Sequence, residues 1–263
     1  MMIDLFSLKG RTALITGGSR GIGKMIARGF VEQGAKVYIS SRKAADCEAT
    51  ACELSSAGGA CIALPQDVST VAGAQALAAA FMAKEPKLDI LVNNAGAAWM
   101  AKFDEFPEKG WDKVMDLNVK SPFFLTQALA PALRAAASAD RPAKVINIAS
   151  IDGIYLTPNE TYSYLASKSA LIHLTRRMAS KLIADNIVVS GIAPGPFKSD
   201  MNIAARDNPD MIAAAVPAKR IGRDEDMAGA AVYLASRAGD YVVGATLTVD
   251  GGVAFASTAR DWY

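Results

Sequence analysis

Short apolar runs alternate along the chain with longer segments of helical composition. Runs such as ALIT, DILVNN and KVINIA are apolar at consecutive positions rather than at every second position. This pattern is typical of strands that are covered on both faces, and therefore of a parallel sheet. It predicts strands at residues 12–16, 36–41, 60–66, 90–93, 144–149, 187–193 and 246–249.

The segments between these runs have many alanines, few prolines and apolar residues three or four positions apart, which predicts helices. The predicted helices are residues 22–33, 44–57, 71–84, 108–137, 162–184 and 225–236. Their regular alternation with strands predicts an α/β protein: a single-domain Rossmann fold whose doubly wound, seven-stranded parallel sheet is flanked by helices on both faces. No linker or repeat divides the chain, so we expect one domain over residues 1–263.

Residues 194–223 break this rhythm, with prolines at positions 194, 196, 209 and 217. Loops of this length inside a compact domain are often functional. We therefore expect a mobile loop over the substrate, and a surface excursion without a role is the alternative.

The charge balance excludes a general attraction to nucleic acid or membranes, because 28 basic side chains face 26 acidic ones. No apolar run reaches the ~18 residues of a membrane span. The first ten residues, MMIDLFSLKG, have no signal-peptide pattern. Cys47, Cys52 and Cys61 form no CxxC pair and lie far from the single histidine, so we expect neither zinc nor disulfides. These features predict reduced thiols, no metal and a cytoplasmic location.

The first predicted strand runs directly into TGGSRGIG, residues 16–23, and then into a helix. Gly17, Gly21 and Gly23 allow a sharp turn and a close backbone approach, and the following helix N-terminus offers N–H groups to a pyrophosphate. A glycine-rich turn without a ligand is the alternative. Ser19 also matches the nucleophile elbow of serine hydrolases, but too few residues precede this strand to form that fold, and His173 is the single candidate base.

The end of the second strand indicates which nicotinamide cofactor binds. NAD-binding proteins place an acid there to contact the ribose 2′-hydroxyl. Here the strand ends in Ser41, Arg42 and Lys43, without a carboxylate, and Arg20 lies in the glycine turn. These groups are suited to a 2′-phosphate and predict NADP(H). Solvated surface charges are the alternative.

Tyr164 and Lys168 lie four residues apart, on one face of a predicted helix. An adjacent cation favours the phenolate, so we expect a lowered pKa for Tyr164 and proton exchange with a substrate oxygen. Ser150 ends the fifth strand, at the ligand-binding edge of the sheet. Tyr162 is a competing phenol, but its partner four residues on is Ala166.

Several further motifs occur in order: NNAG at 93–96, Asn118 in DLNV, YLASK at 164–168, Pro194-Gly195, and DGG at 250–252. Together with the glycine turn and Ser150 they resemble the short-chain dehydrogenases/reductases over essentially the whole chain. The resemblance implies that Tyr164 is the general acid/base, that Ser150 orients the carbonyl, and that Lys168 binds the nicotinamide ribose and lowers the tyrosine pKa. It implies that Asn118 holds a water of a proton relay.

The resemblance also extends the cofactor site. It implies that Asp67 and Val68 meet the adenine, that Asn94, Ala95 and Gly96 line the adenosine side, and that Phe197 and Ser199 meet the carboxamide. The family more often has Ile or Val in place of Phe197 and Thr in place of Ser199. With these, the predicted cofactor residues are Gly17, Ser19, Arg20, Gly21, Ile22, Gly23, Ser41, Arg42, Lys43, Asp67, Val68, Asn94, Ala95, Gly96, Tyr164, Lys168, Pro194, Gly195, Phe197 and Ser199.

Within the family, NNAGAAW, GWDKVMDLNV and DRPAKVINIAS look most similar to 3-oxoacyl reductases of the rhamnolipid-synthesis type. The implied reaction is NADPH-dependent reduction of a 3-oxoacyl thioester to the 3-hydroxyacyl product, with the substrate carried by acyl carrier protein or coenzyme A. The sequence offers a basic patch for an acidic carrier, at Lys198, Arg206, Lys219, Arg220 and Arg223. It also offers apolar residues that close over an acyl chain or form the core face of a helix: Met201, Ile203, Met211 and Ile212.

Two alternatives remain open from the sequence. One is a sugar or polyol dehydrogenase with the same four catalytic residues. The other is a non-catalytic NADP-binding regulator, which the intact Asn/Ser/Tyr/Lys set argues against. The resemblance also implies a homotetramer or dimer, assembled through helices 108–137 and 162–184.

Overall fold

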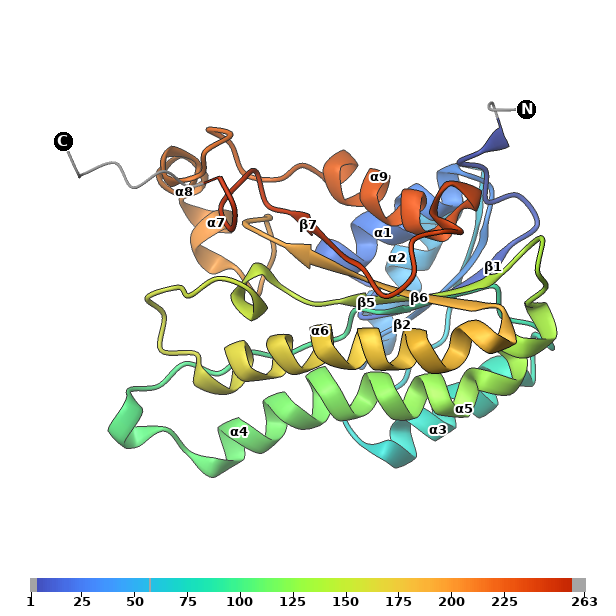
Figure 1. Cartoon of the computed structure of the whole chain (residues 1–263), viewed down its shortest axis with the longest axis horizontal. Helices are drawn as coiled ribbons and strands as arrows, with labels where there is room; N and C mark the ends of the chain where they lie inside the picture. The colour runs from blue at the N-terminus through green and yellow to red at the C-terminus, as the bar shows by residue number, and fades with distance from the viewer. Residues whose placement is uncertain (1–3, 57, 257–263) are drawn as a thin grey trace.

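The computed structural model describes residues 4–56 and 58–256, and its strands form one parallel sheet (Figure 1). The spatial order is β3-β2-β1-β4-β5-β6-β7. The chain reverses its direction of travel across the sheet between β1 and β4, which confirms the predicted doubly wound Rossmann fold. The strands are β1 (Thr12–Thr16), β2 (Lys36–Ser40), β3 (Ala60–Ala63), β4 (Ile90–Asn93), β5 (Ala143–Ile148), β6 (Ile187–Pro194) and β7 (Thr246–Val249).

Helices cover both faces of the sheet: α1, α2 and α9 lie on one side, and α3, α4, α5 and α6 on the other (Figure 1). Within the described residues, no helix has both the length and the apolar character that a bilayer crossing requires. The helices are α1 (Gly21–Glu32), α2 (Ala44–Ser56), α3 (Val71–Met82), α4 (Glu108–Met115), α5 (Ser121–Ala136), α6 (Tyr162–Leu182), α7 (Ile203–Asp207), α8 (Pro209–Ala215) and α9 (Asp224–Ala235), with short turns η2 (Phe103–Glu105), η3 (Asp116–Lys120), η4 (Ile151–Gly153), η5 (Ile183–Asp185) and η6 (Arg237–Gly239).

The two helical layers explain why the strands are apolar at consecutive positions. In β1, Ile15 packs into the core beneath α1 and α9, and its neighbour Leu14 packs into the core beneath α3 and α5. In β5, Ile146 and Val145 divide in the same way. Adjacent side chains of a strand point to opposite faces of the sheet. A sheet with helices on both faces therefore needs apolar residues at consecutive positions.

The predicted strands agree with the structure to within one residue, except for the third. That strand ends at Ala63 instead of residue 66. Leu64 and Gln66 still donate backbone hydrogen bonds to Ile39 and Ser41 of the neighbouring segment, at 2.8 and 3.0 Å. Pro65 lies between them, where its backbone faces the open edge of the sheet, so its missing N–H removes no bond to the neighbouring segment.

The helix predicted over residues 108–137 is confirmed as one unbroken helical run over residues 108–136, but one turn inside it is not α-helical. The structure has α4, then the π-helical turn η3, then α5. Within the turn, the N–H of Ser121 bonds to the carbonyl of Asp116, five residues back. Such turns insert an extra residue into a helix and are frequent at functional sites. Asn118 lies in this one and is buried.

The segment 194–223 is more ordered than a loop, since it contains α7 and α8. Helix α8 begins at Pro209, where the missing N–H costs nothing. The segment also closes on itself, because Phe197 forms an isolated parallel bridge with Gly222. A Cβ on Gly222 would lie 2.3 Å from the ring of Phe197, which is only 2% exposed.

We expect Gly222→Ala to destabilise the protein, because the new methyl group overlaps a ring that the core holds in place. Overpacking of this kind costs about 1–3 kcal/mol. Urea unfolding of G222A, F197L and the double variant tests it. The smaller leucine makes room, so the alanine should cost less in the F197L background. Additive effects of the two substitutions would contradict this account.

Candidate active site

The glycine turn between β1 and α1 is clamped by the chain that follows β4. The backbone N–H groups of Asn94 and Ala95 donate to Oγ1 of Thr16, both at 3.0 Å. The side-chain amide of Asn94 donates to the carbonyls of Thr16 and Gly17, at 2.9 and 3.1 Å. A Cβ on Gly23 would lie 2.2 Å from the carbonyl oxygen of Gly17. Asn94 therefore fixes the shape of the turn, and its place beside the adenosine stays a prediction.

Positive-φ glycines complete this cradle. Gly17 and Gly21 have φ values of 64° and 51°, in the left-handed region that suits glycine. The N-terminus of α1 follows directly, so backbone N–H groups and the positive end of the helix dipole converge on one point. The backbone of Ser19 is fixed by α2, because its carbonyl accepts a 2.8 Å hydrogen bond from the hydroxyl of Thr50. Ile22 is half-buried against the core. The cradle therefore has the geometry and charge to bind a pyrophosphate.

Cationic groups lie around this turn as predicted, although Arg20 has a partner that the sequence did not indicate. Its Nη1 lies 2.7 Å from Oδ2 of Asp200, a residue of the 194–223 segment. Arg42 and Lys43 are exposed just after β2, and Oγ of Ser41 donates to the carbonyl of Lys43. Basic side chains are therefore present both in the glycine turn and directly after β2.

The remaining predicted cofactor residues lie at the same carboxyl edge of the sheet. Asp67 and Val68 follow β3; Val68 is buried, and the carboxylate of Asp67 accepts a 2.9 Å bond from the N–H of Ser69. Gly195 follows β6, where its N–H bonds to the carbonyl of Val249 in the segment that ends β7. A Cβ there would lie 2.6 Å from Cβ of Asp250, so only glycine fits beside Pro194.

The segment after Gly195 returns to the glycine turn. A Cβ on Gly21 would lie 3.2 Å from Cβ of Ser199, so these two residues are neighbours. The phenyl ring of Phe197 is buried in the main core and is not free to reach a ligand. Of the two predicted carboxamide contacts, Phe197 can therefore contribute only its backbone.

The four predicted catalytic residues come from three elements. Ser150 lies two residues after β5 and caps η4, Tyr164 and Lys168 lie on α6, and Asn118 lies in η3. Nζ of Lys168 donates to the carbonyl of Ile148 at 2.8 Å and lies 5.5 Å from the ring centre of Tyr164. A Cβ on Gly96 would lie 3.3 Å from Oδ1 of Asn118 and 3.8 Å from Nζ of Lys168. Gly96 thus leaves open the space on which Asn118 and Lys168 converge.

Asn118 is held by the chain after β4. Its side chain makes a two-point pair with the backbone of Ala97, accepting at 2.8 Å and donating at 2.9 Å. It also donates to Oγ of Ser167 at 3.0 Å. These bonds connect η3 to α6 and to the segment that clamps the glycine turn.

The electrostatics differ from the expectation that Lys168 lowers the pKa of Tyr164. Burial raises the pKa of Tyr164 to about 12, opposed by the hydroxyl of Ser150. Burial also lowers the pKa of Lys168 to about 8. In this structure the loss of water around Tyr164 outweighs the expected effect of the ammonium group, which lies over the ring face and bonds to a carbonyl. Tyr164 is therefore a protonated phenol near neutral pH.

Tyr162, the competing phenol, belongs to another cluster. Its hydroxyl donates to Glu160 at 3.0 Å, and its ring packs edge-on against Phe103 and Phe106, at 5.6 and 5.7 Å between centres. These rings and Trp111 line a hollow of about 600 Å³ at the start of α6. Tyr162 is thus separated from Ser150 by its position on the helix.

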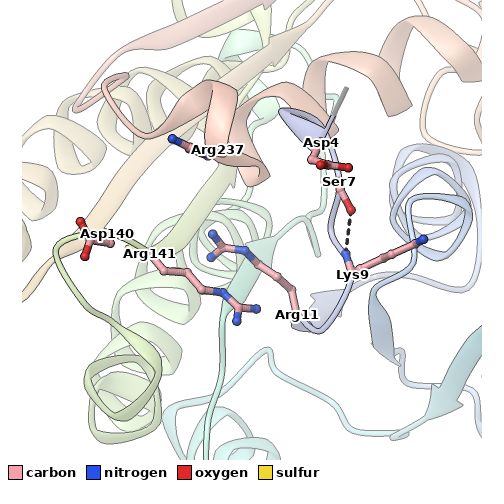
Figure 2. Close-up of a pocket in the computed structure, with 7 residues that line it drawn as sticks. All are labelled: Asp4, Ser7, Lys9, Arg11, Asp140, Arg141 and Arg237. Carbon is pink, nitrogen blue, oxygen red and sulfur yellow. Dashed lines mark hydrogen bonds between the residues drawn. The ribbon is translucent and has the colours of Figure 1, made fainter. Parts of the chain in front are cut away.

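A second hollow, of about 510 Å³, lies at the opposite, amino edge of the sheet (Figure 2). Figure 2 shows Arg11 and Arg141 side by side in it. Their guanidinium groups tie two loops together, since Arg11 donates to the carbonyl of Pro142 at 2.8 Å and Arg141 to that of Gly10 at 2.7 Å. This hollow is remote from the predicted catalytic residues. We infer that its arginines have a structural role, which is to hold the two loops together.

The cysteines take no part in the site. Cys47 and Cys61 are buried, Cys52 is exposed, and all three are free thiols. Burial raises the pKa of Cys61 to about 12, which keeps it unreactive. Across residues 4–56 and 58–256, no group of three or more His, Cys, Asp or Glu side chains is placed to hold a metal ion.

Sequence reasoning missed three residues of the site. Asp200 pairs with Arg20 from 180 positions away, which no local pattern reveals. Thr16, which receives two bonds from the NNAG segment, ends the first strand and looks like an ordinary strand residue. Asp152 lies two positions after Ser150, and that placement at the carboxyl edge of β5 was a usable signal.

Comparisons with known proteins match nearly the whole chain. A family model described as enoyl-(acyl carrier protein) reductase matches residues 17–254. The chain is 48% identical over 254 residues to the rhamnolipids biosynthesis 3-oxoacyl-[acyl-carrier-protein] reductase of Pseudomonas aeruginosa, covering 95% of this chain and 99% of that protein. It is 38% identical over 258 residues to the 2-dehydro-3-deoxy-D-gluconate 5-dehydrogenase of Dickeya dadantii, covering 96% and 98%.

Solved structures give the same result. The Pseudomonas aeruginosa RhlG/NADP active-site complex superposes with a TM-score of 0.92 at 48% identity, covering 95% of this chain and 99% of that one. A gluconate 5-dehydrogenase from Burkholderia cenocepacia, in complex with NADP and tartrate, superposes with a TM-score of 0.88 at 36% identity, covering 96% and 98%.

We expect Asn118→Ala to destabilise the protein, because it leaves the N–H and C=O of Ala97 without their partner. An unsatisfied partly buried group costs about 1–3 kcal/mol. Urea unfolding measures the change, with Lys120→Ala as the matched control. Lys120 is an exposed residue of the same turn and makes only a surface ion pair with Asp116, so its loss should cost about 0.5 kcal/mol or less. Equal losses for the two variants would contradict this account.

Proposed function

Because the chain belongs to the short-chain dehydrogenase/reductase family, we propose that it reduces the 3-oxo group of an acyl thioester with NADPH. The family resemblance, the oxidoreductase class and the cofactor NADP are confirmed by the relatives. The observation that supports this choice of substrate is the 48% identity to a 3-oxoacyl-[acyl-carrier-protein] reductase over 95% of the chain.

The residues at the carboxyl edge suit reduction. NADPH supplies the hydride to the carbonyl carbon. Tyr164, a protonated phenol below about pH 12, donates the proton to the carbonyl oxygen. The hydroxyl of Ser150 donates a hydrogen bond to that oxygen and polarises the bond. Lys168 stabilises the negative charge left on Tyr164 and contacts the nicotinamide ribose, and Asn118 orients a water that returns the proton.

The cofactor fits the cradle that the structure builds. The glycine turn would hold the pyrophosphate at the N-terminus of α1, and it can take this shape because Gly17, Gly21 and Gly23 carry no side chains. Arg20, Ser41, Arg42 and Lys43 receive the 2′-phosphate. Asp67 and Val68 would border the adenine, and Asn94 to Gly96 would line the adenosine. The carboxamide would lie beside Pro194, Gly195, the backbone of Phe197 and the hydroxyl of Ser199.

An acyl chain fits the apolar residues around the mouth of the site. Met201, Ile203 and Met211 are 50%, 58% and 62% exposed, so they are not the core face of a helix; Ile212 is half-buried. Leu156, after β5, is 83% exposed. These residues follow β5 and β6, which are neighbours in the sheet. A thioester with an apolar chain would cover them.

The basic patch proposed for a carrier is weaker than its composition suggests. Arg206 pairs with Asp200 and Asp207, at 3.1 and 2.7 Å, and Arg220 pairs with Asp226. Lys198, Lys219 and Arg223 are exposed and remain available for an acidic carrier protein or the phosphates of coenzyme A. The assembly that we propose is a homotetramer or dimer, through the layer of α4, α5 and α6.

The function is tested with NADPH oxidation against an acetoacetyl thioester, 5-ketogluconate and a crotonyl thioester. We expect turnover of the first, and Tyr164→Phe should lower kcat about 100-fold or more, because the proton donor is lost. NADPH binding, followed by fluorescence, should change little. Tyr162→Phe is the matched control, since that phenol lies in the aromatic cluster. Preference for 5-ketogluconate or crotonyl thioester would overturn the substrate, and an active Y164F would overturn the mechanism.

The lowered pKa of Lys168 generates a pH prediction. Below pH about 8 Lys168 is charged and Tyr164 is protonated. In the reduction direction, kcat/KM for NADPH, which reports groups of the free enzyme, should therefore be level and then fall as pH rises through about 8. Lys168→Arg keeps its charge, so its activity, although lower, should not fall in that range. If kcat/KM fell through the same pH range in the wild type and in Lys168→Arg, deprotonation of Lys168 would be ruled out as the cause of the decline.

A further inference from the structure

An acidic residue that the proposed mechanism does not use lies beside the predicted catalytic cluster. Asp152 is in η4, directly after β5, and its backbone N–H donates to Oγ of Ser150 at 3.2 Å. The turn packs closely on α6, since a Cβ on Gly153 would lie 2.7 Å from the carbonyl carbon of Lys168. Oγ of Ser169 also donates to the carbonyl of Gly153, at 3.0 Å. These contacts hold Asp152 at the junction of Ser150 and Lys168.

Asp152 is half-buried, and its carboxyl group interacts electrostatically with Tyr164 and Lys168. Burial raises its pKa, opposed by the hydroxyl of Thr157, the charge of Lys168 and the hydroxyl of Ser150. Its negative charge in turn raises the pKa values of Tyr164 and Lys168. Any charge that a substrate carries near the reacting carbon therefore lies in the field of Asp152.

We propose that Asp152 determines specificity by repelling substrates with a carboxylate near the reacting carbonyl, and so selects neutral 3-oxoacyl thioesters over 3-oxo acids. The inference rests on the proposed function for the identity of the preferred substrate. In a 3-oxo acid, the carboxylate is two carbons from the ketone that accepts hydride. A thioester places a neutral group at the same position. Like charges in a partly desolvated site repel more strongly than in water.

The test compares matched neutral and anionic ketones: an acetoacetyl thioester with acetoacetate, and methyl levulinate with levulinate. In wild type we expect kcat/KM to favour the neutral member of each pair. Asp152→Asn keeps the shape and removes the charge, and should reduce that preference about 10-fold or more, through a lower KM for the anion. Asp152→Ala is the second variant, in case the side-chain amide of Asp152→Asn disturbs the turn. It also removes the charge, so it should reduce the preference in the same way.

Glu160→Gln is the matched control, because Glu160 is an exposed acid of the same connection whose side chain bonds to Tyr162 and to the N–H of Phe103. It should leave the preference unchanged. A structural role for Asp152 would lower turnover of both members alike, and that result would overturn the inference. So would a wild type that shows no preference. If thioesters are not reduced but levulinate esters are, the proposed function fails, and the ester pair alone decides the role of Asp152.

Discussion

The proposed chemistry depends on one ammonium group that the fold removes from water. Nζ of Lys168, on a side chain 4% exposed, is retained by a 2.8 Å hydrogen bond to the carbonyl of Ile148. Burying a cation is unfavourable unless polar groups compensate it, and the lowered pKa of Lys168 expresses that imbalance. The group is therefore well placed to be stabilised further by negative charge that arrives or develops beside it, as on Tyr164 after proton transfer.

Several elements converge to hold that position. Strand β5 supplies the carbonyl of Ile148 and then Ser150, and α6 supplies Tyr164 and Lys168 four residues apart. The π turn directs Asn118 toward the same space, and Gly96 keeps that space open. The segment after β4 joins the two halves of the site, since Asn94 shapes the glycine turn and Ala97 pairs with Asn118. This one segment therefore contacts both the glycine turn and Asn118.

The sequence predicted the sheet well because burial on both faces leaves a direct trace, consecutive apolar residues, in each strand. It predicted the glycine turn and the Tyr/Lys pair because each is a local spacing with a local physical reason. It did not predict η3, since a π turn depends on where Asn118 finds partners at Ala97 and Ser167, far away in the chain. It misjudged the pKa of Tyr164 for a related reason: spacing reveals an adjacent charge, whereas desolvation depends on the tertiary packing.

The pair between Arg20 and Asp200 connects the glycine turn to the 194–223 segment. Arg20 lies in the glycine turn, and Asp200 lies in the segment that carries the exposed apolar residues of the mouth. Both side chains are about half exposed or more, at 63% and 49%, so the pair contributes at most about 1 kcal/mol. A 2′-phosphate beside Arg20 brings a stronger negative charge to the same guanidinium group. The ion pair is thus a weak link between the glycine turn and the 194–223 segment, too weak to prevent Arg20 from binding another anion.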